Sequence, residues 1–277
     1  MEIPFVTLLT DFQEGSSYIA EMKGMIYSAC PNARVIDLTH SIEPQNIEHA
    51  SIILRNTAVR FPLGTLHVAV VDPGVGSQRR LIYAEAGSHR FLLPDNGILS
   101  DFCDAFPLER AFVLQKPFLA TLQTNGSHTF HGRDILAPAA GFLLNGGQPE
   151  AFGEPTERLV TISRPVATRQ GERLCGRIVY ADSFGNLITN IRESDLPPEE
   201  ERRARLKISA SGVEIQGVRR TYSAGGVGDF IALVGSSGFL EIAVVNGNAA
   251  RALQKRRASP TCAAVSTWIC TVDEEKQ

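Results

Sequence analysis

The stretch LHVAVVD, residues 66–72, decides the fold class of this 277-residue chain. It is a nearly continuous run of apolar residues that ends at an acid. Strands of this kind are buried on both faces, which is typical of a parallel sheet covered by helices on each side. We therefore predict an α/β domain with a mostly parallel sheet around this strand.

The sequence before this run alternates between strand and helix patterns. Apolar runs at Phe5–Leu9 and Arg34–Leu38 are each followed by residues with helical spacing, which predicts strand–helix pairs. The two helices are expected over Tyr18–Cys30 and directly after Asn46, a residue type that suits a helix N-cap. The remaining expected elements are a β-hairpin from strands 81–86 and 91–93, and a helix over residues 130–144 that ends at glycines 146 and 147.

The pattern changes between Pro149 and Pro165. From Gly176 onward, short strand-like runs are separated by turns, which predicts a smaller antiparallel β-barrel or sandwich. The runs cover residues 177–181, 187–191, 206–208, 213–215, 230–234 and 240–245. We place the boundary near residue 163, so that an α/β domain spans residues 1–163 and a β domain spans residues 164–277.

Composition excludes several classes of protein. The net charge of -3 offers no basic surface for nucleic acid or an anionic membrane. No apolar run is long enough to span a bilayer, and no signal-peptide pattern is present. The five cysteines are odd in number and contain no C-x-x-C pair, so we expect buried, unreactive thiols and a cytoplasmic location.

Acids follow two of the expected strands. Asp11 comes after the first strand and Asp72 after the run that decides the fold. In open parallel sheets, ligands bind beyond the carboxyl ends of the strands. An acid at such a position either accepts hydrogen bonds within a turn or binds a ligand, and the residues alone leave both readings open.

Two further segments of the first domain carry candidate groups. The segment DPGVGSQRR, residues 72–80, matches neither a P-loop nor G-x-G-x-x-G, and it suits a hairpin loop as well as a ligand site. The segment HGRD, residues 131–134, places a histidine at a helix start, where it is either structural or catalytic. A hard-ligand metal site from Asp72, Asp95, His131 and Asp134 is conceivable, but no metal-binding spacing supports it, so we predict no metal.

The second domain offers two small loops. In DSFGN, residues 182–186, turn chemistry accounts for the glycine and asparagine, while the phenylalanine could stack on a ring beside an amide that reads a base edge. The segment GSSG, residues 235–238, is compatible with a plain turn or with close approach of a ligand.

These signals are weak singly, but their order along the chain is informative. The chain resembles the S-adenosyl-L-methionine (SAM) hydroxide adenosyltransferases, which are adenosine-forming SAM hydrolases related to fluorinases and chlorinases. The segments that carry the resemblance are LLTDF (8–12), MKG (22–24), DLTH (37–40), FPLGT (61–65), VDPGVG (71–76), PDNG (94–97), FHGRD (130–134), FGN (184–186), TNI (189–191) and GSSG (235–238). They follow the family's order over most of the chain.

The resemblance implies an N-terminal α/β domain, a C-terminal β domain and a homotrimer with sites between subunits. By motif position, the water-activating triad falls on Asp72, Arg79 and His131, and the acid that holds the ribose hydroxyls falls on Asp11. The implied contacts to the nucleoside and methionine portions of the substrate are Asp182, Phe184, Asn186 and Ser236. The sequence departs from the family at Gln13 and Ser16, where the family usually has a glycine and an aspartate that helps to hold the methionine end.

The implied chemistry suits these residues. The SAM sulfonium leaves as a neutral thioether, so the reaction lacks only a competent nucleophile. An imidazole and a carboxylate can take a proton from water, and a guanidinium can orient the resulting hydroxide for attack at the ribose C5′ carbon. This predicts hydrolysis to adenosine and L-methionine without a metal or cofactor. The alternatives are a non-catalytic SAM- or adenosine-binding module, a SAM-dependent halogenase and a phosphoesterase, the last of which needs a metal or a phosphate-binding loop.

Overall fold

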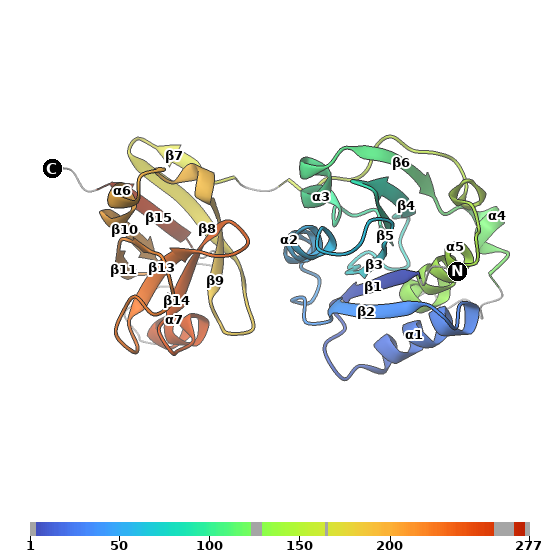
Figure 1. Ribbon diagram of the computed structural model, residues 1–277, viewed down its shortest axis with the longest axis horizontal. Helices are drawn as coiled ribbons and strands as arrows, with labels where there is room; N and C mark the ends of the chain where they lie inside the picture. The colour runs from blue at the N-terminus through green and yellow to red at the C-terminus, as the bar shows by residue number, and fades with distance from the viewer. Residues whose placement is uncertain (1–3, 123–128, 164–165, 258–268, 275–277) are drawn as a thin grey trace. The chain divides into compact units, whose positions relative to one another are not determined.

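The fold is given by a computed structural model that describes residues 4–122, 129–163, 166–257 and 269–274. Residues 1–163 and 164–277 form two compact units, which are called the first and second unit below. Figure 1 shows their helices and strands, and each unit is described by itself.

The first unit contains a six-stranded sheet of order β2-β1-β3-β5-β4-β6. The pairs β1–β2, β1–β3 and β3–β5 are parallel, and β4 is antiparallel to both β5 and β6. The strands are β1 (Phe5–Thr10), β2 (Arg34–Thr39), β3 (Leu66–Val70), β4 (Leu81–Ala86), β5 (His89–Pro94) and β6 (Leu108–Val113). The helices are α1 (Ser17–Ala29), α2 (Ile47–Ala58), α3 (Ser100–Ala105), α4 (Lys116–Leu119), a π-helical turn (Gly132–Leu136) that runs into α5 (Ala137–Leu144), and a 3₁₀ turn (Pro149–Phe152).

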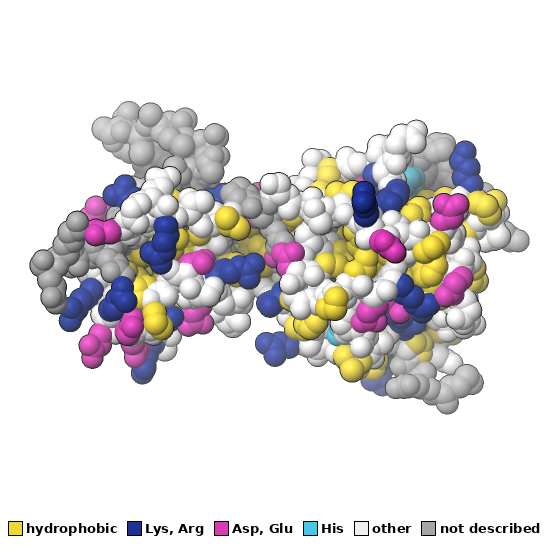
Figure 2. Space-filling model, turned by 90° about the horizontal axis from the view of Figure 1, so that it is seen from above, with side chains coloured by type: hydrophobic (Ala, Val, Ile, Leu, Met, Phe, Trp, Pro, Cys, Tyr) yellow, Lys and Arg dark blue, Asp and Glu magenta, His cyan; other side chains and the backbone are white. Residues whose placement is uncertain are grey.

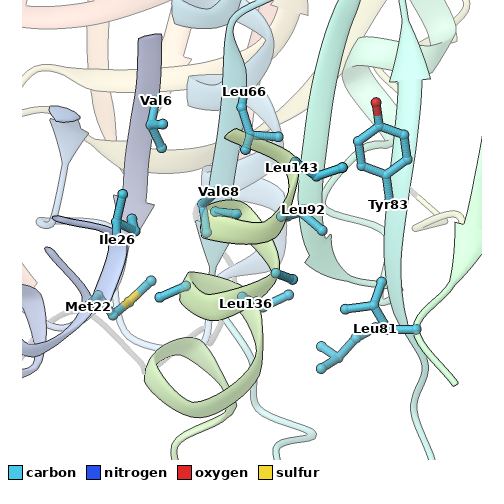
Figure 3. Packing of buried hydrophobic residues seen from close by; sticks show 14 of the residues in the cluster. Val6, Met22, Ile26, Leu66, Val68, Leu81, Tyr83, Leu92, Leu136 and Leu143 are labelled. Carbon is cyan, nitrogen blue, oxygen red and sulfur yellow. The ribbon is translucent and has the colours of Figure 1, made fainter. Parts of the chain in front are cut away.

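Side chains of the sheet alternate between two apolar layers, as the period of a strand requires. One layer joins β1 and β3 to α1 and α5, and Figure 3 shows Val6, Val68, Met22 and Leu136 meeting there. Helix α5 approaches α1 so closely that a Cβ on Gly141 would lie 2.3 Å from Cβ of Ala29. A side chain at that glycine would therefore push the two helices apart.

The other layer lies under α2 and α3, where Leu54 and Phe102 pack on the sheet. The Asn46 side chain accepts a hydrogen bond of 2.9 Å from the backbone N–H of His49, which confirms the predicted helix cap. Figure 1 shows α1 and α5 on one side of the strands and α2 and α3 on the other. The predicted α/β domain with a mostly parallel, doubly covered sheet is confirmed.

Two buried histidines lie within this second layer. Nδ1 of His67 is 2.7 Å from the Thr7 hydroxyl, and its Nε2 is 3.2 Å from Nδ1 of His89. Burial lowers the pKa of His67 to about 3, with the nearby His89 contributing in the same direction, and burial also lowers the pKa of His89. Both rings are therefore neutral at pH 7.

The second unit is built on one curled sheet of order β11-β10-β15-β8-β9-β14-β13-β12, with β7 paired to β8. Its pairs are antiparallel except β12–β13, which confirms the predicted antiparallel β domain. The strands are β7 (Thr168–Gln170), β8 (Arg173–Ala181), β9 (Leu187–Arg192), β10 (Leu206–Ala210), β11 (Val213–Gln216), β12 (Val218–Arg219), β13 (Phe230–Val234), β14 (Phe239–Val244) and β15 (Ile269–Glu274). The helical segments are a 3₁₀ turn (Glu193–Asp195), α6 (Glu200–Ala204) and α7 (Ala249–Arg257).

The chain itself links the two ends of this sheet. Strands β11 and β12 lie at opposite ends of the strand order, yet only Gly217 separates them in sequence. Gly217 has φ 74°, and a Cβ there would lie 2.5 Å from the carbonyl oxygen of Ala204. Only glycine fits this position, and the turn it makes lets the sheet curl back on itself.

Surface and thiol features bear on the exclusions made from composition. On the face shown in Figure 2, acidic and basic side chains are interspersed on each unit. No described helix is long and apolar enough to cross a membrane. The free thiols Cys30, Cys103 and Cys175 are only partly buried, so the expectation of buried thiols is wrong for these three. Cys262 lies outside the described residues, and the structure does not describe the side chain of Cys270. Burial still raises the pKa of Cys103 to about 11, which keeps it a thiol.

Candidate active site

The two strand-end acids lie at one edge of the first sheet. Thr10 of β1 pairs with Val70 of β3 in parallel register. Asp11 follows Thr10 directly, and Asp72 comes two residues after Val70. Parallel strands end at the same edge of a sheet, so the folding of two separate strand–helix pairs delivers both carboxylates to the edge where ligands bind.

Asp72 is held by a single arginine from its own loop. Nε of Arg79 donates to both carboxylate oxygens of Asp72 at 2.8 Å, and Nη2 donates to Oδ2. The side chains of Asp72 and Arg79 are 6% and 11% exposed, so this charged pair is largely shielded from water. A Cβ on Gly74 would lie 3.3 Å from Cγ of Arg79, which shows how closely the turn wraps the arginine stem.

The same guanidinium reaches His131. Nη2 of Arg79 lies 2.8 Å from Nδ1 of His131. An arginine can only donate, so in this geometry Nδ1 of His131 accepts, and the proton of the neutral ring is on Nε2. Acid, guanidinium and imidazole therefore form one connected group within the first unit.

His131 precedes an unusual helix start. The turn Gly132–Leu136 is π-helical, and such turns frequently occur at functional sites. A Cβ on Gly132 would lie 3.2 Å from Sδ of Met22 and 3.4 Å from a methyl of Val70, so the backbone after the histidine is pressed onto the core. The next residue, Arg133, donates to Glu21 of α1 at 2.7 Å and to Asp134 at 2.6 Å, which fastens the turn to α1.

The turn around Asp11 is ordered by neighbouring backbone and side-chain groups. Oδ2 of Asp11 accepts from the backbone N–H of Gln45 at 2.8 Å. Gln13 has φ 68°, a left-handed conformation that favours glycine, and its amide donates to the carbonyl of Ile42 at 2.9 Å. Ser16 caps α1 by accepting from the N–H of Tyr18. Both departures from the family pattern therefore have local structural partners.

The candidate residues of the second unit lie in two turns. Oδ1 of Asp182 accepts from the N–H groups of Phe184 and Asn186 at 2.9 and 2.8 Å, and Oδ2 accepts from the Asn186 amide at 3.0 Å. Asn186 is thereby buried, while Phe184 is 76% exposed and presents its ring. Ser236 lies in the tight turn Gly235–Gly238 between β13 and β14.

The structure also reveals residues that were not predicted from the sequence. Glu241 of β14 is buried, and Oε2 accepts from the Tyr222 hydroxyl at 2.7 Å. Burial and the charge of Asp182 raise the pKa of Glu241, against the opposing effect of the Tyr222 hydrogen bond. Its carboxylate fills the space beside Gly235, where a Cβ would collide with it. Glu241 thus packs against the turn at Gly235 and lies within reach of the charge of Asp182. Its signal in the sequence was a lone acid inside an apolar strand.

The metal alternative finds no support in the described residues, where no group of three or more histidine, cysteine or acidic side chains could hold an ion. Asp72 binds Arg79, Asp95 binds Arg80 with Oδ2 and the N–H of Val160 with Oδ1, and Asp134 binds Arg133. These carboxylates, which were the conceivable ligands, are therefore engaged by arginines.

Known proteins resemble this chain over most of its length. The SAM hydroxide adenosyltransferase N-terminal domain matches residues 6–153, and the C-terminal domain of the same family matches residues 176–261. An (R)-S-adenosyl-L-methionine hydrolase of Thermus thermophilus is 35% identical over 92% of this chain and 97% of that protein. A fluorinase of Actinoplanes sp. is 23% identical over 87% of this chain and 90% of that protein. A crystal structure of an uncharacterized conserved protein from Thermotoga maritima superposes with a TM-score of 0.82 and 27% identity, and it covers 97% of this chain and 100% of that one.

Proposed function

The chain belongs to the SAM hydroxide adenosyltransferase family, and we infer that it hydrolyses S-adenosyl-L-methionine to adenosine and L-methionine. The observation that carries this function most directly is the connected group of Asp72, Arg79 and His131 at the ligand-binding edge of the sheet. A halogenase is disfavoured, because the fluorinase is a more distant relative than the hydrolase. A module that only binds SAM would have no use for this group.

Each member of the group has a role in activating water. Nδ1 of His131 is the basic nitrogen of the ring and accepts from Arg79 at 2.8 Å, which leaves no room for water between the two groups. In this proposal the contact opens when water and substrate bind, and the water then accepts from the freed guanidinium N–H and donates to Nδ1. Asp72 holds the guanidinium in place and balances its charge. The hydroxide then attacks the C5′ carbon in line with the carbon–sulfur bond. Methionine departs as a neutral thioether, so no general acid is needed.

The remaining candidates bind the substrate in this proposal. Asp11 accepts hydrogen bonds from the ribose hydroxyls, for which its Oδ1 is suited because Oδ2 is partly used by Gln45. Contacts to the nucleoside and methionine portions come from the second unit, from Asp182, Phe184, Asn186 and Ser236. The exposed ring of Phe184 suits stacking on the purine. We further propose a cytoplasmic homotrimer with sites between subunits, as the family resemblance implies.

The decisive experiment is turnover in water labelled with ¹⁸O. We expect equal amounts of adenosine and L-methionine, with the label on the 5′ oxygen of adenosine. The His131→Ala protein provides the matched control for spontaneous breakdown of SAM, and a parallel reaction with EDTA should proceed unchanged. Label in methionine, or methylthioadenosine as the product, would refute the mechanism, and loss of activity with EDTA that a divalent ion restores would refute its independence of metal.

A further inference from the structure

Two sequence motifs, MKG at 22–24 and DLTH at 37–40, lie outside the water-activating group, yet the structure joins them to the turn that carries Asp11. Nζ of Lys23 donates to Oδ2 of Asp37 at 2.6 Å, and Oδ1 of Asp37 lies 3.0 Å from Nε2 of His40. Nδ1 of His40 is 2.8 Å from the hydroxyl of Thr10, the residue before Asp11. These contacts form a line from α1 through the end of β2 to the end of β1.

The His40 ring has a defined neighbour at each of its two nitrogens. The hydroxyl oxygen of Thr10 accepts from the N–H of Phe12 at 3.3 Å, so its own proton is free to go to Nδ1 of His40. Nε2 of His40 lies 3.0 Å from Oδ1 of Asp37, close enough for a charge contact but without the alignment of a hydrogen bond. Burial acts to raise the pKa of Asp37, but Lys23 and His40 together hold it below its ordinary value. The carboxylate therefore lies on the Nε2 side of the ring, while the Nδ1 side is bound by the Thr10 hydroxyl.

The backbone of the same segment holds the other end of the turn. The carbonyl of His40 accepts from the N–H of Gln13 at 2.9 Å. Thr10 and His40 are 0% and 1% exposed, so the bond between their side chains is shielded from competing water. Asp11 lies between Thr10 and Gln13 in the chain. The His40 ring binds Thr10 and the His40 carbonyl binds Gln13, so His40 fixes the backbone on both sides of Asp11.

We propose that His40 is a positioning residue that, through Thr10 and Gln13, fixes the direction of the Asp11 carboxylate and so sets the recognition of ribose hydroxyls. This inference rests on the proposed function, in which Asp11 accepts those hydroxyls. Hydrogen bonds to a carboxylate reward alignment, because a displaced acceptor loses strength steeply with angle. A loose Asp11 turn would still hold a nucleoside, but it would distinguish ribose from deoxyribose poorly.

The test compares Thr10→Val with Thr10→Ser. Valine keeps the shape of threonine without its hydroxyl, and serine restores the hydroxyl. The measurement is the ratio of affinities for adenosine and 2′-deoxyadenosine by isothermal titration calorimetry. We expect Thr10→Val to lower this ratio about tenfold, the value of one lost hydrogen bond, and Thr10→Ser to restore it. A merely structural role would weaken both ligands alike and leave the ratio unchanged.

Two further variants keep the test decisive. Asp37→Asn alters a side chain that is 38% exposed, so it should fold even if Thr10→Val does not, and it should lower the ratio by less than Thr10→Val. Wild-type ratios in both variants would overturn the proposal. Asp11→Ala should abolish the discrimination, and if it does not, the ribose is held elsewhere and the proposal falls. Binding of these ligands needs no turnover, so a failure of the hydrolysis itself would be recognised separately in the labelled-water experiment.

Discussion

Nη2 of Arg79 and Nδ1 of His131 lie 2.8 Å apart, although 52 positions separate the two residues in the chain. The same guanidinium is bound to Asp72, so its planar fork serves two partners at once. A lysine ammonium at this position is a point charge without that fork. The two simultaneous contacts therefore require a guanidinium, and a positive charge alone at position 79 would not reproduce them.

Arg79→Lys should consequently lower kcat about 10²-fold, which is the typical cost of losing one aligned donor to a developing anion. KM for SAM should change little, because Arg79 contacts the water rather than the substrate in this mechanism. Steady-state kinetics would measure both constants. Arg80→Lys is the matched control, since Arg80 binds Asp95 instead. A fall in kcat of similar size in both variants would show that replacing arginine damages the fold, and that the loss is not specific to the contacts of the Arg79 guanidinium with Asp72 and His131.

His131→Ala tests the general base. We expect kcat to fall by about 10²–10⁴, as is typical when a general base is removed, with nearly unchanged affinity for SAM. Circular dichroism would verify that the variant is folded. A folded His131→Ala protein with undiminished turnover would remove the main argument for hydrolysis over simple nucleoside binding. If only the affinity fell, the imidazole would be a substrate contact, and Asp72 would be the next candidate base.

Asp11→Ala should show the opposite kinetic pattern. It removes an acceptor that contacts the ribose in the ground state as well as in the transition state, so KM should rise more than kcat falls. The rise should be about tenfold or more, since hydrogen bonds to charged groups contribute more than neutral ones. Steady-state kinetics beside His131→Ala would separate binding from chemistry. A large fall in kcat at unchanged KM would assign Asp11 to the chemical step.

Mixed oligomers test the proposed sites between subunits. His131→Ala damages the first unit and Phe184→Ala removes an exposed ring from the second, so each variant alone should be impaired. If a site combines units from two subunits, oligomers that contain both variants will include some intact sites. Coexpression with two affinity tags would isolate these oligomers, and their kcat/KM for SAM should exceed the mean of the separate variants. An activity equal to that mean would place each site within one subunit.

The buried histidines predict a loss of stability in acid. Burial lowers the pKa of His67 to about 3 and that of His49 to about 4, the latter against the opposing charge of Glu43, whereas an unfolded histidine titrates near its ordinary value of about 6.5. Above that value neither state binds these protons, and the contribution of the histidines to stability is complete. As the pH falls below it, the unfolded chain takes up protons first, so the free energy of unfolding falls until the folded-state pKa values are reached.

Each such histidine should contribute a slope of about 1.4 kcal/mol per pH unit between these limits. Urea unfolding at pH 7, 6, 5 and 4 would measure the slope. His67→Gln cannot titrate there, so its stability should depend less steeply on pH than that of the wild type. An equal slope in both proteins would mean that His67 is not kept neutral by the fold.

The sequence allowed prediction of those elements whose pattern is long or capped. The run at residues 66–72 gave a buried parallel strand, and Asn46 gave the start of α2. No element was predicted from Ser100 to Leu119. Helices α3 and α4 have six and four residues, too few for helical spacing to emerge, and β6 has charged residues at 109 and 110 that interrupt its apolar run. The helix expected over residues 130–144 is present from residue 132, but its π-helical first turn has no distinct sequence signature.

The candidate site was predictable in part for a similar reason. Strand ends located Asp11 and Asp72, because parallel topology fixes where strands end. The closure of Arg79 onto His131 depends on how a glycine-containing loop turns and on a side-chain rotamer, and spacing encodes neither. Glu241 was not predicted, because a single acid in an apolar strand contributes little to a periodic pattern. In the structure, the hydrogen bond from the Tyr222 hydroxyl offsets part of the free-energy cost of burying its carboxylate.

The position of β15 determines when the second unit can be completed during synthesis. Residues 269–274 lie between β10 and β8 in the middle of the sheet, so the last described strand is an internal one. All strands of the first unit's sheet lie within residues 5–113 and can pair while the ribosome is still translating the rest of the chain. In the second unit, the β10–β11 hairpin cannot be joined to β8 through hydrogen bonds until β15, which pairs with both β10 and β8, has been synthesised. A ribosome that stalls before residue 269 would therefore present a sheet with two unsatisfied inner edges, the kind of nascent chain that chaperones must shield.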